Sequence, residues 1–243
     1  MFNKICTVSF VFFMAISLFA QANKNYDGPK PENYPGSKAF VFSYTPFQSD
    51  LSGIAAGSYT DFNSSGTSVT LFNRNIYGVG FKYFFSNNWS ILGGLNFGFG
   101  SSTEDVFQGT TNIGTDEESG SLIGVAVDVN YHLNSFYSVS PYLGANINFG
   151  TYSYTFEEKR TVAGSTNEKN EFSSSNFGIG LNIGFDWFFT EGLALGGKYT
   201  IGFKSMGSPE YTYTSGTTST TTNFGSSTAI GTSTGTFTLS VYF

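Results

Sequence analysis

Apolar and polar residues alternate along most of this 243-residue chain. In residues 122–133 the odd positions, from Ile123 to Leu133, are apolar or aromatic, and the even positions are small or polar. Such alternation is typical of a β-strand whose two faces meet different surroundings. The first alternating segment contains Phe40, Phe42 and Tyr44, and the others are residues 76–85, 89–99, 122–133, 141–152, 176–189, 193–203 and 237–243. The sequence therefore predicts an all-β fold with eight strands.

The connections between these segments alternate in length. Short turns are expected at residues 86–88, 134–140 and 190–192. Long segments rich in Ser, Thr, Gly and Asn lie at residues 48–73, 101–120, 156–172 and 204–228. This asymmetry predicts an antiparallel up-and-down transmembrane β-barrel with short periplasmic turns and long extracellular loops. Thr67–Phe72 and Glu210–Thr214 keep a strand-like pattern, so hairpins above the membrane are expected there.

The polar face of the strands decides between a membrane barrel and a soluble barrel of the lipocalin type, whose apolar face points inward. A water-exposed face normally carries many Lys and Glu residues, whereas here it carries Gly, Asn and Ala with few charges. Charged residues make up 12% of the chain and aromatic residues 19%, against about 25% charged residues in typical soluble domains. The composition favours an apolar face turned toward lipid.

The N-terminus predicts export. Lys4 precedes a mostly apolar run over residues 5–20, and Ala20-Gln21-Ala22 offers a cleavage site after Ala20 or Ala22. We expect residues 1–22 to be a signal peptide. Residues 23–37 are polar and contain three prolines, which favours an extended periplasmic tail, and residues 38–243 would form the barrel.

Two features of composition exclude other kinds of function. The one cysteine, Cys6, lies in the expected signal peptide, so the exported chain would have no disulfide, catalytic thiol or zinc–thiolate site. The 11 basic and 17 acidic residues give no basic surface for nucleic acid. We expect no cofactor and no metal.

The end of the chain carries a recognisable pattern, Phe237-Thr-Leu239-Ser-Val241-Tyr-Phe243, with a terminal aromatic residue. Together with the strand-turn-strand segments 83–89 and 186–192, it resembles the small outer-membrane β-barrel proteins of Gram-negative bacteria, which include OmpX and the OmpA transmembrane domain. The resemblance covers residues 38–243. It implies a porin-like, monomeric barrel in the cell outer membrane, surrounded by lipids and lipopolysaccharide and inserted by the barrel-assembly machinery. It also implies an assembly signal at Phe237, Leu239, Val241 and Phe243.

The inward face carries isolated charges of both signs near the short turns. They are Lys82, Asp128, Asp186 and Lys198. Because buried charges need partners and eight strands leave an interior just wide enough for side chains, we expect a plug of ion pairs rather than a conducting path. His132 shares this face, and we expect it to join the network rather than to bind a metal.

Two classes of function remain open. The first is a non-enzymatic, structural or surface-interaction protein, adhesion-like in the manner of OmpX, with an extracellular partner. The alternative is a narrow pore or an OmpW-like channel for small hydrophobic molecules, for which inward Gly78, Gly80, Gly178 and Gly180 would leave room. A lipid A deacylase is disfavoured because His132, the sole candidate base, faces inward near the periplasmic end. Residues 101–120 and 156–172 are expected to be solvated, charged loops.

Overall fold

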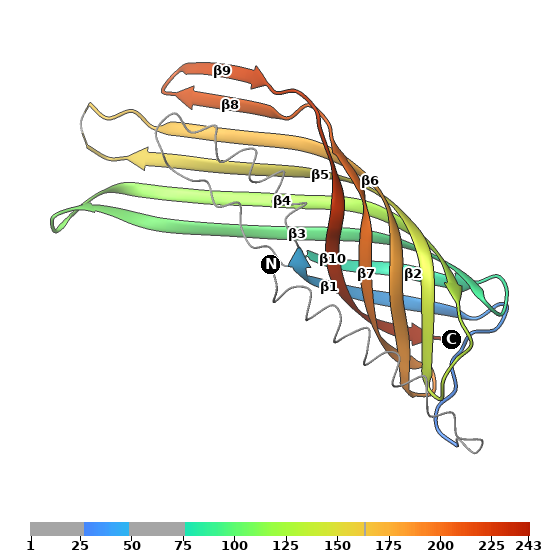
Figure 1. The fold of residues 1–243 in the computed structure, drawn as a ribbon. Coiled ribbons are helices and arrows are strands. Elements are labelled where there is room, and N and C mark those ends of the chain that lie inside the picture. The colour runs from blue at the N-terminus through green and yellow to red at the C-terminus, as the bar shows by residue number, and fades with distance from the viewer. Residues whose placement is uncertain (1–26, 49–75, 163) are drawn as a thin grey trace, which may run out of the picture.

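A computed structural model describes residues 27–48, 76–162 and 164–243, and Figure 1 shows their strands curving around a barrel. The strands are β1 (Lys38–Gln48), β2 (Ile76–Phe84), β3 (Trp89–Gln108), β4 (Thr111–His132), β5 (Val139–Arg160), β6 (Glu168–Thr190), β7 (Leu193–Met206), β8 (Glu210–Ser215), β9 (Thr218–Asn223) and β10 (Ser227–Tyr242). None of the described residues belongs to a helix of sufficient length and apolarity to span a membrane. The expected signal peptide and most of segment 48–73, with Thr67–Phe72, lie outside the described residues.

Eight of these strands form a closed antiparallel ring, in the order β1-β2-β3-β4-β5-β6-β7-β10. The first and last strands close it, with Phe40 opposite Val241 on one side and Phe81 on the other. The three short turns lie where the sequence predicts them, after β2, β4 and β6. The predicted eight-stranded up-and-down barrel is confirmed. A closed ring leaves no strand edge unpaired in hydrocarbon.

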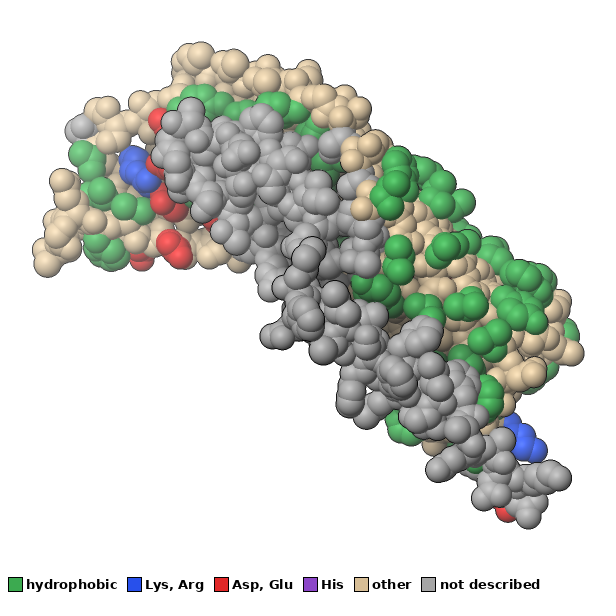
Figure 2. All heavy atoms as spheres, in the orientation of Figure 1, with side chains coloured by type: hydrophobic (Ala, Val, Ile, Leu, Met, Phe, Trp, Pro, Cys, Tyr) green, Lys and Arg blue, Asp and Glu red, His purple; other side chains and the backbone are tan. Residues whose placement is uncertain are grey.

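The apolar side chains of the ring point outward. Leu181 is 71% exposed and Phe99 is 67% exposed, and Figure 2 shows hydrophobic side chains spread over the outer wall of the barrel. The inward positions hold buried polar residues such as Asn130, Asn146 and Asn182. This orientation is opposite to that of a soluble barrel and suits a wall surrounded by lipid.

Exposed aromatic side chains mark two levels on this wall. One girdle lies near the short turns, on the side that short turns of such barrels occupy in the periplasm, and we call it the periplasmic girdle. It consists of Phe85, Trp89, Tyr131, Trp187, Phe189 and Phe243. An extracellular girdle consists of Tyr44, Tyr77, Phe99, Phe149, Phe177 and Phe203. On β6 the two girdles are about ten residues apart, close to the length of a strand that crosses a bilayer at a tilt.

Four strands continue far beyond the extracellular girdle. β3 has 20 residues, β4 and β5 have 22 each, and β6 has 23, about twice what a membrane crossing needs. Their outer segments and the hairpin β8–β9 form an open sheet in the order β3-β4-β5-β6-β8-β9, seen at the upper left of Figure 1. We call this part the protruding sheet. It comprises residues 100–108, 111–120, 153–160, 168–174, 210–215 and 218–223.

The protruding sheet corrects one prediction. Residues 101–120 and much of 156–172 are not long loops but hairpin strands, with connections at residues 109–110 and 161–167. Inward and outward residues continue to alternate above the membrane there. Only the chemistry of the outward residues changes, from apolar residues to Ser, Thr and charged residues. On β5 this change runs from Phe149 to Ser153. The predicted strand at Glu210–Thr214 is confirmed as β8.

The C-terminus closes the barrel seam. The backbone N–H of Phe243 donates to the carbonyl of Lys38 over 2.9 Å, and its ring stacks on Phe40 with centroids 5.3 Å apart. Phe237, Leu239 and Phe243 all point outward from the closing strand and its end. Val241 is paired with Phe40 of β1 on one side and with Leu193 of β7 on the other.

We predict that deletion of Phe243 slows membrane insertion, because the seam loses a hydrogen bond and aromatic contacts of about 0.5–1.5 kcal/mol per pair. Folding into lipid vesicles would be followed by the difference in gel migration between unboiled and boiled samples. As the control, removal of four residues around the β3–β4 turn should leave the insertion rate unchanged. Equal rates for the Phe243 deletion and the parent protein would contradict the role assigned to this residue.

Candidate functional site

The periplasmic end of the interior is filled by aromatic side chains. Phe84, Phe188 and Tyr242 are buried together with Ala39 and Ala194. The rings of Phe188 and Tyr242 lie 5.1 Å apart, and those of Phe84 and Tyr242 lie 6.5 Å apart. This aromatic layer comes from β1, β2, β6, β7 and β10, so it draws on most of the wall.

An ion pair lies next to the aromatic layer. Lys82 Nζ is 2.7 Å from Asp186 Oδ2, and the two side chains are 4% and 1% exposed. Lys82 also donates to the hydroxyl of Tyr242 over 3.5 Å and lies 5.8 Å from the ring centre of Tyr142. β2 and β6 are not neighbours in the ring, so this pair connects two separate parts of the wall.

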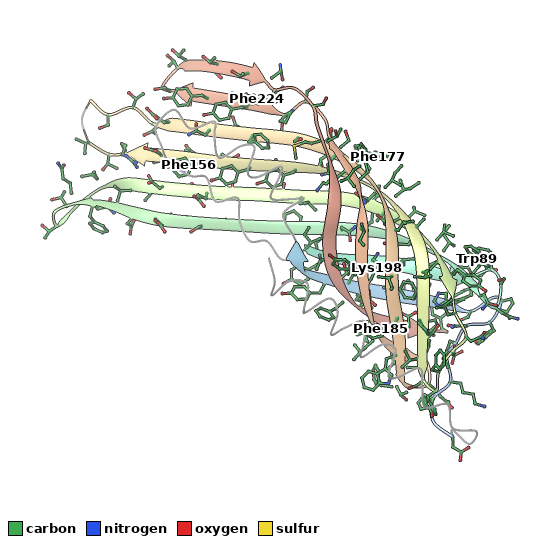
Figure 3. All side chains as sticks on the ribbon, in the orientation of Figure 1. Trp89, Phe156, Phe177, Phe185, Lys198 and Phe224 are labelled. Atoms are coloured by element: carbon green, nitrogen blue, oxygen red, sulfur yellow. The ribbon has the colours of Figure 1, made fainter. Side chains whose placement is uncertain are left out.

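A second ion pair also crosses the interior. Lys198 Nζ is 2.6 Å from Asp128 Oδ2, and it joins β7 to β4, which do not pair with each other. Lys198 is labelled in Figure 3. The other carboxylate oxygen of Asp128 accepts a hydrogen bond from Asn146, which in turn accepts one from Asn148 over 2.7 Å. Both carboxylates therefore have a charged partner, as burial requires.

His132 lies next to the aromatic layer, against Phe84, and both nitrogens of its ring contact hydroxyl groups. Its Nε2 is 2.9 Å from the hydroxyl of Ser90, and its Nδ1 is 2.9 Å from that of Ser140. Its ring packs against Phe84 and Tyr142, with centroids 4.7 and 5.2 Å away. The three polar side chains are completely buried. The Ser–His contact therefore lies away from the lipid-facing surface, where a lipid substrate would arrive.

The N-terminal segment reaches this same layer. Asn33 donates from its side chain to the hydroxyl of Ser140 over 2.5 Å. The N–H of Gly36 donates to the carbonyl of Phe84, and the N–H of Phe84 donates to that of Ser37. Sequence reasoning missed Asn33, Ser90 and Ser140, because small polar residues at strand ends carry no distinctive signal.

The protruding sheet contains a second cluster of charges. Lys159 on β5 pairs with Glu117 on β4 at 2.6 Å, and Arg160 pairs with Asp116 at 2.5 Å and with Glu158 at 2.6 Å. The hydrogen bond to Glu117 raises the pKa of Lys159, and the hydrogen bond to Asp116 raises the pKa of Arg160. Both bases therefore stay charged at physiological pH and hold the two hairpins together.

The face of the protruding sheet that continues the barrel interior carries aromatic residues. They are Tyr154, Phe156, Phe172, Tyr211 and Tyr213. Tyr154 is buried, 6% exposed, and Phe156 is labelled on β5 in Figure 3. Tyr211 and Tyr213 lie in the predicted strand at Glu210–Thr214. Continued alternation is the sequence signal that would have identified Phe156 and Phe172, but the neighbouring charges favoured a loop interpretation. No three His, Cys, Asp or Glu side chains of the described ranges are grouped as metal ligands.

Several solved structures of outer membrane proteins are similar to this chain. The chain is similar to a major outer membrane protein from Thermus thermophilus, with 10% identity and a TM-score of 0.50, over 85% of this chain and 99% of that one. It is also similar to OprG from Pseudomonas aeruginosa, with 13% identity and a TM-score of 0.42, over 90% and 99%. Ail, the attachment invasion locus protein of Yersinia pestis, matches with 11% identity and a TM-score of 0.39, over 86% and 99%.

Curated proteins gave no match to this sequence. The family profile of the outer membrane protein beta-barrel domain, in contrast, matches residues 11–241, nearly the whole chain. The chain belongs to the family of outer membrane protein β-barrel domains, which implies a location in the outer membrane.

Proposed function

We propose that this protein is a non-enzymatic outer-membrane barrel with a closed interior that acts at the cell surface through its protruding sheet. The observation that carries the proposal is the length of β3 to β6, about twice that of a membrane crossing. Anchoring alone does not require the outer halves of these strands. Export by the signal peptide 1–22 and insertion guided by residues 237–243 belong to the same proposal.

The packing of the interior supports a closed barrel. The two ion pairs join non-neighbouring strands, and the aromatic layer lies beside them toward the periplasm. Lys82, Asp128 and Asp186 are each at most 3% exposed when side chain and backbone are counted together. A solute crossing this level would have to separate paired charges in a narrow interior. The narrow pore and the channel for hydrophobic molecules are therefore the less favoured alternatives.

The edge of the protruding sheet offers a surface for a partner. β9 pairs with β8 along its whole length, and all of its six residues are exposed. Its sequence, Thr218–Asn223, contains no charge and no proline, although exposed edge strands are usually protected by such residues. Within the described part of the chain, no strand pairs with its other side. An extended polypeptide segment could add to this edge through main-chain hydrogen bonds.

The hairpin geometry identifies the groups that such a partner would use. Ser215 and Thr218 face each other across a two-residue turn. In such a turn the closing residues exchange backbone hydrogen bonds, and every second residue pair along the hairpin is hydrogen-bonded in the same way. The N–H groups of Ser219 and Thr221 consequently point away from β8. The hydroxyl oxygens of Thr212 and Thr221 lie 3.0 Å apart, as expected for a pair without backbone hydrogen bonds between its members, in which the side chains are closer.

In planar bilayers we expect purified wild-type protein to show no steady single-channel conductance, because the two ion pairs and the aromatic layer block the interior. A long-lived open level of constant size would contradict a closed barrel and favour the pore.

We predict that Asp186→Asn lowers the stability of the barrel by about 3–5 kcal/mol, because it leaves the buried charge of Lys82 without a counter-charge. Urea unfolding in lipid vesicles, followed by tryptophan fluorescence, would measure the loss. The double variant Lys82→Met with Asp186→Leu should recover much of it. The exposed pair Lys169–Glu171 provides the control, since Lys169→Met should change stability by about 0–1 kcal/mol. Equal stability of Asp186→Asn and wild type would show that the pair is not buried in this way.

We predict that Thr221→Pro abolishes peptide capture by the β9 edge, because proline removes an N–H that points toward the partner. The probe is a phage library of unstructured peptides, selected on the barrel in nanodiscs. Thr221→Val keeps the N–H and replaces the hydroxyl by a methyl group, so it should retain capture. Failure of wild-type protein to enrich peptides over a variant lacking residues 210–223 would contradict the surface-interaction role.

A further inference from the structure

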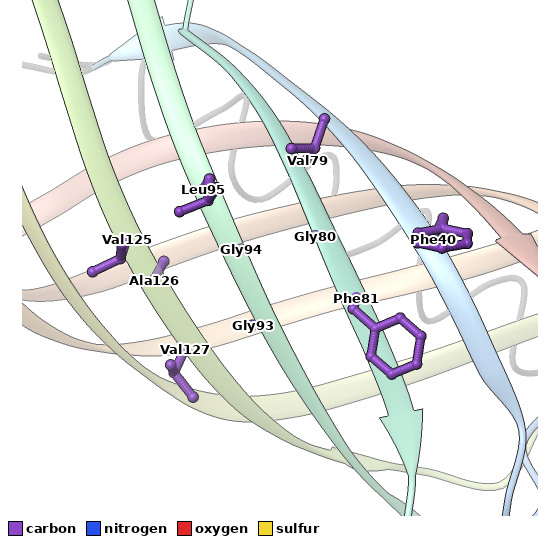
Figure 4. Close-up of a pocket in the computed structure, with 10 residues that line it drawn as sticks. All are labelled: Phe40, Val79, Gly80, Phe81, Gly93, Gly94, Leu95, Val125, Ala126 and Val127. Atoms are coloured by element: carbon purple, nitrogen blue, oxygen red, sulfur yellow. The ribbon is translucent and has the colours of Figure 1, made fainter.

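The lipid-facing wall contains a depression at Gly93. Phe81, Gly93 and Val127 lie opposite one another on β2, β3 and β4 and share the outward face. Glycine at the middle position interrupts this row of side chains, and a depression of about 530 Å³ lies there. Figure 4 shows its lining residues, which are Phe40, Val79, Gly80, Phe81, Gly93, Gly94, Leu95, Val125, Ala126 and Val127. We call it the Gly93 notch.

A second outward glycine shows that such a gap can be filled from within the protein. Gly197 on β7 lies opposite Phe185 on β6, and ring atoms of Phe185 lie 2.9 and 3.2 Å from where a Cβ of residue 197 would be. A Cβ added at Gly93, in contrast, would meet nothing within 4 Å. The ring of Phe185 covers Gly197, whereas the Gly93 notch stays open.

The contacts of Phe81 explain this difference. Phe81 lies opposite Gly93 as Phe185 lies opposite Gly197, but its ring packs toward β1. Its centroid is 5.9 Å from that of Phe40 and 6.4 Å from that of Phe243. The side chain that could have closed the notch is therefore part of the aromatic contacts at the barrel seam.

The shape and chemistry of the notch suit one hydrocarbon chain. Strands lie about 4.8 Å apart and rise about 3.4 Å per residue, so the backbones of Phe81 and Val127 are about 10 Å apart and those of Ile91 and Leu95 about 14 Å apart. The side chains that line the notch contain carbon alone, and the backbone groups of these strands take part in the sheet ladders. An occupant would gain dispersion contacts that the lining atoms otherwise lack.

The position of the notch indicates the source of the chain. Trp89 of the periplasmic girdle lies on the same strand, and Phe81 contacts Phe243 of that girdle. The notch is continuous with the lipid-facing surface. Gly93, which opens it, lies four residues from Trp89 of the periplasmic girdle and six from Phe99 of the extracellular girdle on the same strand. We propose that the Gly93 notch holds one acyl chain of a phospholipid from the periplasmic leaflet and restricts its motion.

Photocrosslinking tests this proposal. A phosphatidylethanolamine with a diazirine in the middle of one acyl chain would be incorporated into vesicles with the folded full-length protein, and labelled peptides would be mapped by mass spectrometry. We expect labelling to be enriched around residues 79–81 and 125–127 relative to the wall around Ala145, an exposed outward position on β5. Equal labelling of the two regions in wild-type protein would overturn the proposal.

Matched variants test the role of the gap itself. Gly93→Leu fills the notch and should remove the enrichment, whereas Ala145→Leu adds similar bulk elsewhere on the wall and should leave it intact. Gel migration of unboiled samples verifies folding, and Gly93→Ala serves as a milder substitution if Gly93→Leu does not fold. Enrichment that persists in the folded Gly93 variants would contradict the assignment. In asymmetric membranes, labelling of the notch by diazirine-bearing lipopolysaccharide rather than by the phospholipid would overturn the choice of leaflet.

Discussion

Hydrocarbon offers no hydrogen-bond partner to a peptide group, and the rest of this structure follows from that constraint. The strands must close into a ring, so β10 pairs with β1. Eight strands enclose a space no wider than the side chains that fill it. Where a large side chain or another strand approaches closely, the wall has glycine. A Cβ at Gly184, for example, would lie 2.5 Å from the ring of Tyr142.

The narrow interior in turn decides how polar groups are arranged. A charge that is placed there loses water and has to find a counter-charge on another strand. Lys82 with Asp186 and Lys198 with Asp128 meet this condition across the barrel. Above the membrane the same sheet meets water, and its ion pairs are partly exposed and lie either between neighbouring strands, as for Lys159 with Glu117, or within one strand, as for Lys169 with Glu171. One continuous sheet therefore contains buried ion pairs across the barrel interior and partly exposed ion pairs above the membrane, and the access of water decides which kind forms.

The period of the sequence predicted the ring strands and the inward position of residues such as Lys82 and Asp186, because alternation reports the two faces of a strand directly. It did not predict which lysine faces which carboxylate, because that depends on strand tilt and on register around the closed ring. The protruding parts of β3 to β6 were missed for another reason. Glu117 and Lys159 look like loop residues when each segment is considered alone, but they become strand residues once the two hairpins lie side by side.

The central claim is that the transmembrane barrel continues as a regular sheet outside the membrane. Residue-resolved amide hydrogen exchange of the protein in lipid bilayers tests it most directly. The account predicts slow exchange in paired amides of β3 to β6 on both sides of the extracellular girdle, with fast exchange at the turn around Gly109 and at the outer edge of β9. Slow exchange confined to the segments between the two girdles, with fast exchange throughout residues 101–120 and 153–172, would contradict it.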